Sequence, residues 1–309
     1  MNANEPPAGG LPPVTPPSGR FIAQLFLVPG MIVLVAVLII LGINYLFIGG
    51  YTPQYFLSKL DSDNHDIRWR GASDLAQHIK RPESKLLKSD VGFALDLAER
   101  LRKALDELAQ QERLHSARIA ELPTAEQEKE WQRLSARRDY SEYRDLVEYL
   151  TAALGDFYVP AGVPLLCEII NREEAPDVKG NTMRRRRAIW ALSNLGANLQ
   201  IIDKELVAQQ RTKIIDDLQS EMNGANAQRR VWAANGLYYL DKSAVAKETP
   251  GLALVDHALA QCAATKDRFL REHVAMAFNF WDGDRAEETL LRLARDDGFG
   301  TLIRITEGD

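Results

Sequence analysis

Histidine and cysteine are scarce in this sequence, and the glycine-rich loops of common enzyme families are missing. The 309-residue chain has five histidines and two cysteines. They form no His-Glu-x-x-His motif and no cluster with the spacing of metal ligands, so we expect no metal site. Phosphate-binding loops, dinucleotide-binding G-x-G-x-x-G loops and the G-x-S-x-G motif of hydrolases are absent too. These absences indicate a protein without a recognisable catalytic centre or cofactor.

The sequence also lacks a basic surplus and a cysteine pair suited to a disulfide. Lys and Arg total 38 against 43 Asp and Glu, which gives a net charge of −5 and a pI near 5.7. Proteins that bind nucleic acids usually carry a clear positive balance, so we expect no nucleic-acid partner. Cys167 and Cys262 lie in predicted helices of different repeats, and we expect both to be buried thiols.

One stretch near the N-terminus lacks charge altogether. No Asp, Glu, Lys or Arg occurs from Phe21 to Ile48, and the part from Met31 to Ile48 has Asn44 as its only strongly polar residue. About 18 helical residues rise about 27 Å, which is close to the thickness of the hydrocarbon core of a bilayer. The run is longer than a signal-peptide core, and no small-x-small cleavage site follows it. We therefore predict a single-pass transmembrane helix over residues 21–49, with the side of the membrane that holds the rest of the chain left open.

Two tails are predicted at the ends of the chain. Residues 1–20 contain six prolines and few apolar side chains, so we expect a disordered spacer there. A docking site for proline-reading domains is the alternative for this segment. A short C-terminal tail is predicted over residues 301–309.

A repeated helical pattern occupies most of the remaining chain. In the stretch MRRRRAIWALSNLG, Arg185 precedes small and apolar residues at helical spacing, and the pattern returns 45 and then 41 residues later. The framework arginines, as we name this repeated position, are Arg68, Arg144, Arg185, Arg230 and Arg271. A period of 40 to 50 residues in apolar helices is typical of an α-solenoid. We therefore predict an all-α solenoid of about five to six helix pairs over residues 52–300.

The predicted second pair is unusually long. From Val91 to Leu108 apolar residues follow one another in steps of four and three, and this seam weakens at Glu112 and His115. Pro123 is expected to end the first helix, and Thr124 with Gln127 predicts a capping box for one continuous return helix. The pattern predicts a coiled-coil-like hairpin over about 86–154, with helices of about 50 Å. The later predicted pairs are 160–171 with 184–196, 206–222 with 227–240, and 250–264 with 266–281, followed by a half-layer at 285–295.

The repeating frame resembles HEAT-type repeats. It reads apolar-Arg-x-x-Ala-Ala-x-Ala-Leu, then a Leu-Gly-Asp turn, then Val-Pro-x-Leu, and its clearest copy is Leu154-Gly155-Asp156 followed by Val163-Pro164-Leu165-Leu166. The resemblance covers about residues 52–296 without the hairpin tip. It implies a non-catalytic scaffold that binds proteins, and with the anchor the chain is similar to membrane-anchored HEAT-repeat proteins of bacteria, some of them linked to transport machinery. HEAT-like folds also include lyases and DNA glycosylases, which is the alternative class of function, although no residue here supports it.

Arginines are the candidate partner-binding residues. The framework arginines either form a ladder that binds an acidic protein or bond carbonyls and carboxylates of the neighbouring layer. The run Arg184–Arg187 circles the start of a helix, because consecutive helical residues point about 100° apart. The candidates are Arg184, Arg185, Arg187, Arg230 and Arg271. The hairpin tip around 112–129 is a second candidate surface, whereas Trp190 and Trp232 are expected in the packing stripe.

Together these features predict a membrane-anchored, non-catalytic scaffold or accessory subunit. Its expected partners are the proteins of a membrane complex, such as transport machinery, and the lipid bilayer around residues 21–49.

Overall fold

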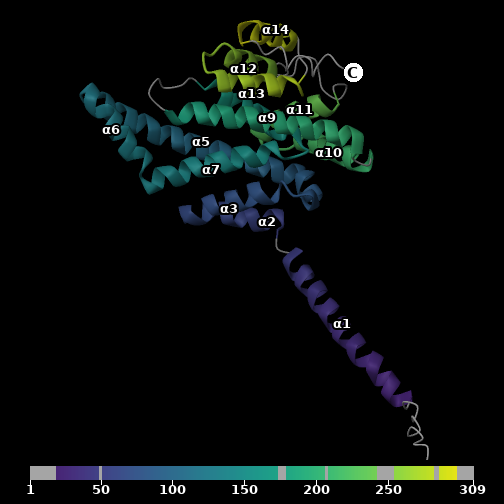
Figure 1. The fold of residues 1–309 in the computed structure, drawn as a ribbon. Helices are drawn as coiled ribbons and strands as arrows, with labels where there is room; N and C mark the ends of the chain where they lie inside the picture. Colours follow the sequence, from purple (N-terminus) through teal and green to yellow (C-terminus); the bar gives the residue numbers. More distant parts are fainter. Residues whose placement is uncertain are drawn as a thin grey trace, which may run out of the picture. The chain divides into compact units, whose positions relative to one another are not determined.

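The computed structural model describes residues 19–48, 51–172, 179–205, 208–241, 254–281 and 285–297, and within these ranges the chain is all-α (Figure 1). The predicted all-α class is confirmed. The chain divides into two compact units, residues Met1–Tyr51 and residues Thr52–Asp309. Most of the predicted N-terminal tail and all of the C-terminal tail lie outside the described residues.

The first unit contains one long helix. Helix α1 (Gly19–Ile48) continues through Pro29. Its large apolar side chains between Leu25 and Ile40 are exposed along the described part of the helix. Among the residues that can be described, no helix combines the length and the apolarity needed to cross a membrane.

The second unit is built from paired helices, whose bounds are as follows. They are α2 (Pro53–Leu60), α3 (His65–His78), η1 (Pro82–Ser84), α4 (Lys85–Lys88), α5 (Val91–Ala120), α6 (Thr124–Ser135), α7 (Arg138–Gly155), η2 (Pro160–Gly162), α8 (Val163–Asn171), α9 (Lys179–Glu205), α10 (Ala208–Met222), α11 (Ala227–Leu240), α12 (Leu254–Ala263), α13 (Arg268–Phe278) and α14 (Ala286–Asp297). Most of the predicted helices lie within a few residues of these bounds, and α11 matches its predicted range. The exceptions are α9, which is longer than predicted, and the predicted return helix of the hairpin, which is divided into α6 and α7.

Side-chain caps explain several of these helix starts. In each case an oxygen of a Thr, Asn or Asp side chain accepts a hydrogen bond from an amide of the first turn, which would otherwise have no partner inside the helix. The capping residues are Thr52, Asn64, Asp90, Asn226 and Asp267.

The second helices of the pairs contact one another in series, with one exception. Helix α3 packs on α7, α7 on α9, and α9 directly on α13, while α8 packs on α12. The predicted regular order puts α11 between α9 and α13, but α9 and α13 lie next to each other (Figure 1). Helix α11 packs instead on η2 and α8, and α10 packs on α5. Helix α9 runs to Glu205, more than two turns beyond its predicted end. The chain therefore starts α10 far from the point where a short turn after residue 196 would have placed it.

The displacement of α10 and α11 brings both cysteines into one interior. Cys167 on α8 and Cys262 on α12 are buried free thiols, as predicted. Burial, with a smaller contribution from nearby Cys262, raises the pKa of the Cys167 thiol. The two cysteines lie in helices of different predicted repeats, yet α8 and α12 are direct neighbours, so the two repeats are not separated here.

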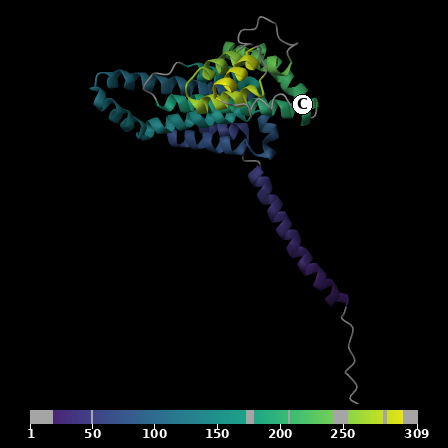
Figure 2. The same cartoon turned by 45° about the horizontal axis from the view of Figure 1, so that its top comes forward.

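The long hairpin has a broken return helix. Helix α5 is continuous over 30 residues, and its end extends with α6 beyond the neighbouring helices (Figures 1 and 2). The predicted continuous return is wrong, because the helix stops after Ser135 and restarts at Arg138. Leu134 and Tyr140 are both buried, yet six residues along a continuous helix would point them about 120° apart, so the break lets both face inward. The predicted capping box is also absent: Gln127 donates to the Leu122 carbonyl at 3.0 Å.

Replacing Asp156 with asparagine should stabilise the protein at neutral pH. Asp156 follows the last turn of α7, is buried, and has an Oδ2 atom without a hydrogen-bond partner. Burial raises the pKa of this carboxyl above 3.8, although Lys80 and Lys88 oppose the shift. A carboxyl with a raised folded pKa favours the fold below its unfolded pKa, and this stabilisation is lost as the pH rises through the folded pKa.

At pH 7 the charged carboxylate therefore destabilises the fold, and its position at a helix C-terminus adds to this effect. We expect Asp156→Asn to raise the free energy of unfolding by about 0.5–1 kcal/mol at pH 7, the size of a charge–dipole interaction. The gain should shrink as the pH falls toward 4 in guanidinium unfolding followed by circular dichroism. An equal gain at both pH values would contradict the assignment.

Candidate partner-binding surface

Three framework arginines bind backbone carbonyls. Arg185 Nε donates to the Ile170 carbonyl at 2.8 Å, at the end of α8. Arg230 Nη1 donates to two carbonyls just after α10, and Arg271 Nη1 donates to the Thr265 carbonyl at 2.9 Å, just after α12. Each arginine thus sits on the second helix of a pair and bonds carbonyls at or just beyond the C-terminal end of the first, where such carbonyls lack helical partners. The sequence allowed two interpretations of the framework arginines: a ladder that binds an acidic protein, or bonds to carbonyls and carboxylates of the neighbouring layer. These three contacts are of the second kind.

The other two framework arginines make different contacts. Arg68 bonds His65 and lies 3.4 Å from Tyr143 Oη, whereas Arg144 bonds its neighbour Asp145 at 3.2 Å. Arg230, on α11, lies outside the series α3, α7, α9 and α13. The five arginines therefore do not form one ladder.

The run Arg184–Arg187 points in four directions, as predicted from helical geometry. Arg184 bonds Glu112 on α5 through two hydrogen bonds of 2.7 and 3.0 Å; the Arg184 side chain is buried and the Glu112 side chain is 13% exposed. Arg186 pairs with Asp267 before α13, and Arg187 pairs with Glu148 on α7 at 3.2 Å. The structure places Arg184 inside the molecule, which leaves Arg187 as the most exposed arginine of the run.

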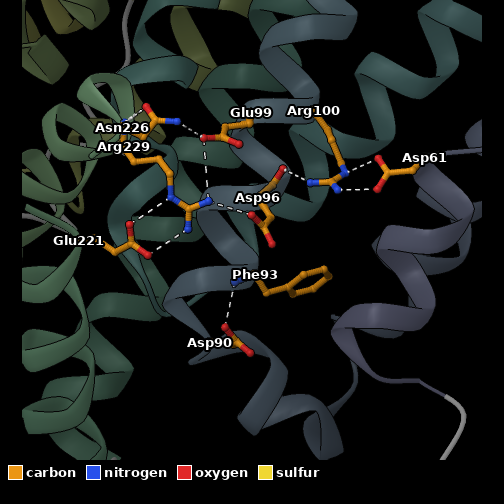
Figure 3. Close-up of polar contacts among 9 residues, drawn as sticks. All are labelled: Asp61, Asp90, Phe93, Asp96, Glu99, Arg100, Glu221, Asn226 and Arg229. Atoms are coloured by element: carbon orange, nitrogen blue, oxygen red, sulfur yellow. Dashed lines mark hydrogen bonds and ion pairs between the residues drawn. The ribbon is translucent and has the colours of Figure 1, made fainter. Parts of the chain in front are cut away.

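A second ionic cluster joins α11 to α5 (Figure 3). Arg229 bonds Asp96 at 2.8 Å and both oxygens of Glu221, while Asn226 Nδ2 donates to Glu99 at 2.8 Å. Burial lowers the pKa of the Arg229 guanidinium, but the bonds to Glu221 and Asp96 outweigh it and raise that pKa. Because each arm of this guanidinium already has a carboxylate partner, we interpret the cluster as a clamp between helices.

Two open hollows offer little to a ligand. One, of about 440 Å³, lies between α5 and α11, and another, of about 600 Å³, lies on α2 and α3. In the first, Arg102 and Asp106 are already engaged with Glu168 and Arg172. In the second, Lys59 pairs with Asp74 at 3.0 Å. No group of His, Cys, Asp and Glu suited to a metal ion occurs among the described residues.

The strongest candidate is an exposed apolar surface on α9 and α13. Trp190 is 58% exposed and Phe269 61% exposed, and Met183 and Met276 on the same two helices are also exposed. The expectation that Trp190 belongs to the packing stripe is wrong, whereas Trp232 is buried as expected. We define the α9–α13 patch as Met183, Arg186, Arg187, Trp190, Phe269, His273 and Met276.

Contacts between the two helices hold this patch in place. The Trp190 and His273 rings lie 6.0 Å apart, and the Arg186 guanidinium lies 5.3 Å from the centre of the Phe269 ring. Asp267 accepts from Arg186 and also from the Leu270 amide at 3.1 Å, which caps α13. Burial opposes ionisation of Asp267, yet these hydrogen bonds lower its pKa. The surface is therefore built on two helices locked together by one carboxylate.

The repeat frame carried a signal for this patch that the sequence reasoning missed. Met183 and Phe269 both lie two residues before a framework arginine, and Trp190 and Met276 lie five residues after it. These positions are seven residues apart, about two turns, so they share a helix face. On α11 the equivalent residues are Gln228 and Asn235, both polar. Helices α9 and α13 have apolar residues at both positions, and these form an apolar stripe in addition to the packed face of each helix.

Comparison with known proteins gives no further assignment. The chain matches no protein-family model. No curated protein matches it significantly.

Proposed function

We propose that this protein is a membrane-anchored, non-catalytic scaffold of HEAT-like helix pairs that binds a protein partner of a membrane complex. The observation that carries the proposal is the exposed α9–α13 patch. Trp, Phe, Met and Arg are the residue types enriched in the cores and hot spots of protein interfaces. Here they lie on one surface of two neighbouring helices rather than scattered singly.

The membrane anchor is the second part of the proposal. It is supported by the absence of charge from Phe21 to Ile48 and by the exposed apolar side chains of α1 between Leu25 and Ile40. Exposed apolar surface on an uncharged stretch of helix is stabilised by lipid and not by water. The side chains of residues 21–24, 41 and 43–48 lie outside the description, so this part depends on the sequence run.

One experiment in intact cells tests both parts. A photo-crosslinking amino acid at Met276 should give a discrete adduct with another protein in the membrane fraction. Trp190→Ala should weaken capture about 30-fold, the effect of losing a hot-spot side chain of about 2 kcal/mol. The same crosslinker at Leu86, which is exposed on α4, is the matched control and should give no such adduct.

Fractionation completes this test. The full chain should stay with membranes in alkaline carbonate, and residues 51–309 alone should be released. An adduct that persists at full strength in Trp190→Ala would refute the docking surface, and a full chain found in the soluble fraction would refute the anchor.

A further inference from the structure

We infer that the α9–α13 patch accepts an amphipathic helix of the partner whose apolar side chains are flanked by carboxylates. This inference rests on the proposed function and names the chemistry of the segment that the patch binds. It is argued from the spacing of the exposed residues and from which member of each ion pair faces the solvent.

The patch presents two parallel apolar stripes. The contact between Arg186 and Phe269 is followed, one turn along both helices, by the contact between Trp190 and His273, so α9 and α13 run in the same direction here. On α13 the exposed Phe269, the half-buried His273 and the exposed Met276 follow the i, i+4, i+7 spacing of one helix face.

The same spacing recurs on α9. Met183, Arg187 and Trp190 are again placed at i, i+4 and i+7. Each stripe spans about 10 Å along its axis, since seven residues rise about 10 Å. A third helix lying along the seam between α9 and α13 would bring its own i, i+4, i+7 side chains against both stripes.

The ion pairs at the edges of the patch present their positive members. Arg187 is 48% exposed and its partner Glu148 is 17% exposed. Arg268 is 72% exposed and its partner Glu272 is 30% exposed. Because the guanidinium is the more exposed member of both pairs, an approaching segment meets mainly positive charge.

Carboxylates on the bound helix suit this arrangement. Arginine has five donors, so a guanidinium that already holds one carboxylate can donate to a second. Lysines at the same positions of a partner helix would meet Arg187 and Arg268 directly, and like charges brought together at an interface oppose binding. The patch therefore selects acidic over basic amphipathic helices, on a chain that is itself acidic overall.

Three designed peptides test the inference on the full chain in nanodiscs of zwitterionic lipid. The first is an 18-residue alanine-based helix with leucines at i, i+4, i+7 and i+11 and glutamates beside them. The second has lysine in place of each glutamate, and the third has the first composition in scrambled order. We expect the glutamate peptide to bind at least 10-fold more tightly than the other two by fluorescence anisotropy, with empty nanodiscs as the blank.

Charge reversal on the protein gives the sharpest result. The double variant Arg187→Glu with Arg268→Glu should prefer the lysine peptide, and the variant with glutamine at both positions should lose the discrimination. Trp190→Ala should weaken binding of the glutamate peptide at least 10-fold, while Leu86→Ala should leave it unchanged. Far-UV circular dichroism of each variant checks that the fold is retained.

Several results would overturn the inference. Equal binding of the glutamate and lysine peptides, or no exchange of preference in the charge-reversed variant, would refute the acidic partner. A dimer that depends on Trp190 in light scattering would show that a second copy covers the patch. If no peptide binds while cellular capture still requires Trp190, the inference fails and the proposed function stands; if capture ignores Trp190, the proposed function fails.

Discussion

Replacing Glu112 with leucine should lower the free energy of unfolding by about 3–5 kcal/mol, the cost of removing one member of a buried ion pair. Glu112 accepts two hydrogen bonds from Arg184, and the two side chains are 13% and 9% exposed. Its Oε1 atom also accepts from Tyr140 Oη at 2.9 Å. After the substitution the Arg184 charge stays buried without the carboxylate that now solvates it. Guanidinium unfolding of the full chain in detergent, followed by circular dichroism, measures the effect.

Two further variants separate the buried charge from the loss of an ordinary ion pair. Glu130→Gln removes the partner of Arg133 in an exposed pair of α6, and we expect a change below about 0.5 kcal/mol. Glu112→Met combined with Arg184→Met should recover most of the lost stability, because apolar residues of similar volume can replace a buried pair. A loss below about 1 kcal/mol for Glu112→Leu would mean that other groups or solvent stabilise the Arg184 charge.

The contacts of Glu112 with Arg184 and Tyr140 show what the sequence could and could not predict about the hairpin. The apolar seam of α5 visibly weakens at Glu112, so a polar feature was detectable there. Its partner could not be found, because Arg184 lies 72 residues away and appears in the sequence as part of a basic run. Local patterns reveal that a buried polar group needs a partner, but long-range packing selects which one.

The order of the helix pairs shows the same limit. Caps and apolar spacing placed most helices within a few residues, since these signals are local. The position of α10 and α11 depends on contacts such as Arg229 with Asp96, which are 133 residues apart. A repeat frame predicts that each helix pair packs on the pair that precedes it in the sequence. It contains no signal that α10 and α11 leave this order and let α9 pack directly on α13.

The patch was missed for a related reason. Trp190 and Trp232 both lie near framework arginines, but at different positions of the frame, five residues after Arg185 and two residues after Arg230. A helix can have apolar residues on its packed face and also on its exposed face. The presence of a tryptophan therefore does not by itself indicate which face it occupies. Comparison of equivalent frame positions across α9, α11 and α13 would have distinguished them.

Substituting alanine for Gly155 should destabilise the protein by about 2–3 kcal/mol, the upper range for added volume in a packed interior. A Cβ atom on Gly155 would lie 2.5 Å from the Ala191 Cα and 2.6 Å from its carbonyl oxygen. These are backbone atoms of α9 and cannot rotate away, so α7 and α9 would have to separate. The gain in helix propensity, about 1 kcal/mol at most, works in the opposite direction and is too small to compensate.

Gly92→Ala is the matched control, because it is the same substitution in another helix of this unit. The nearest atom to a Cβ there is Asp90 Oδ1 at 3.5 Å, an ordinary contact, so we expect a change between zero and about 1 kcal/mol in the stabilising direction. Opposite signs for the two variants in guanidinium unfolding would show that close approach of two backbones, and not flexibility, requires glycine at position 155. Since Arg187 on α9 pairs with Glu148 on α7, separating these helices should also weaken binding of the glutamate peptide. Equal and stabilising effects of both substitutions would mean that α7 and α9 can move apart at no cost.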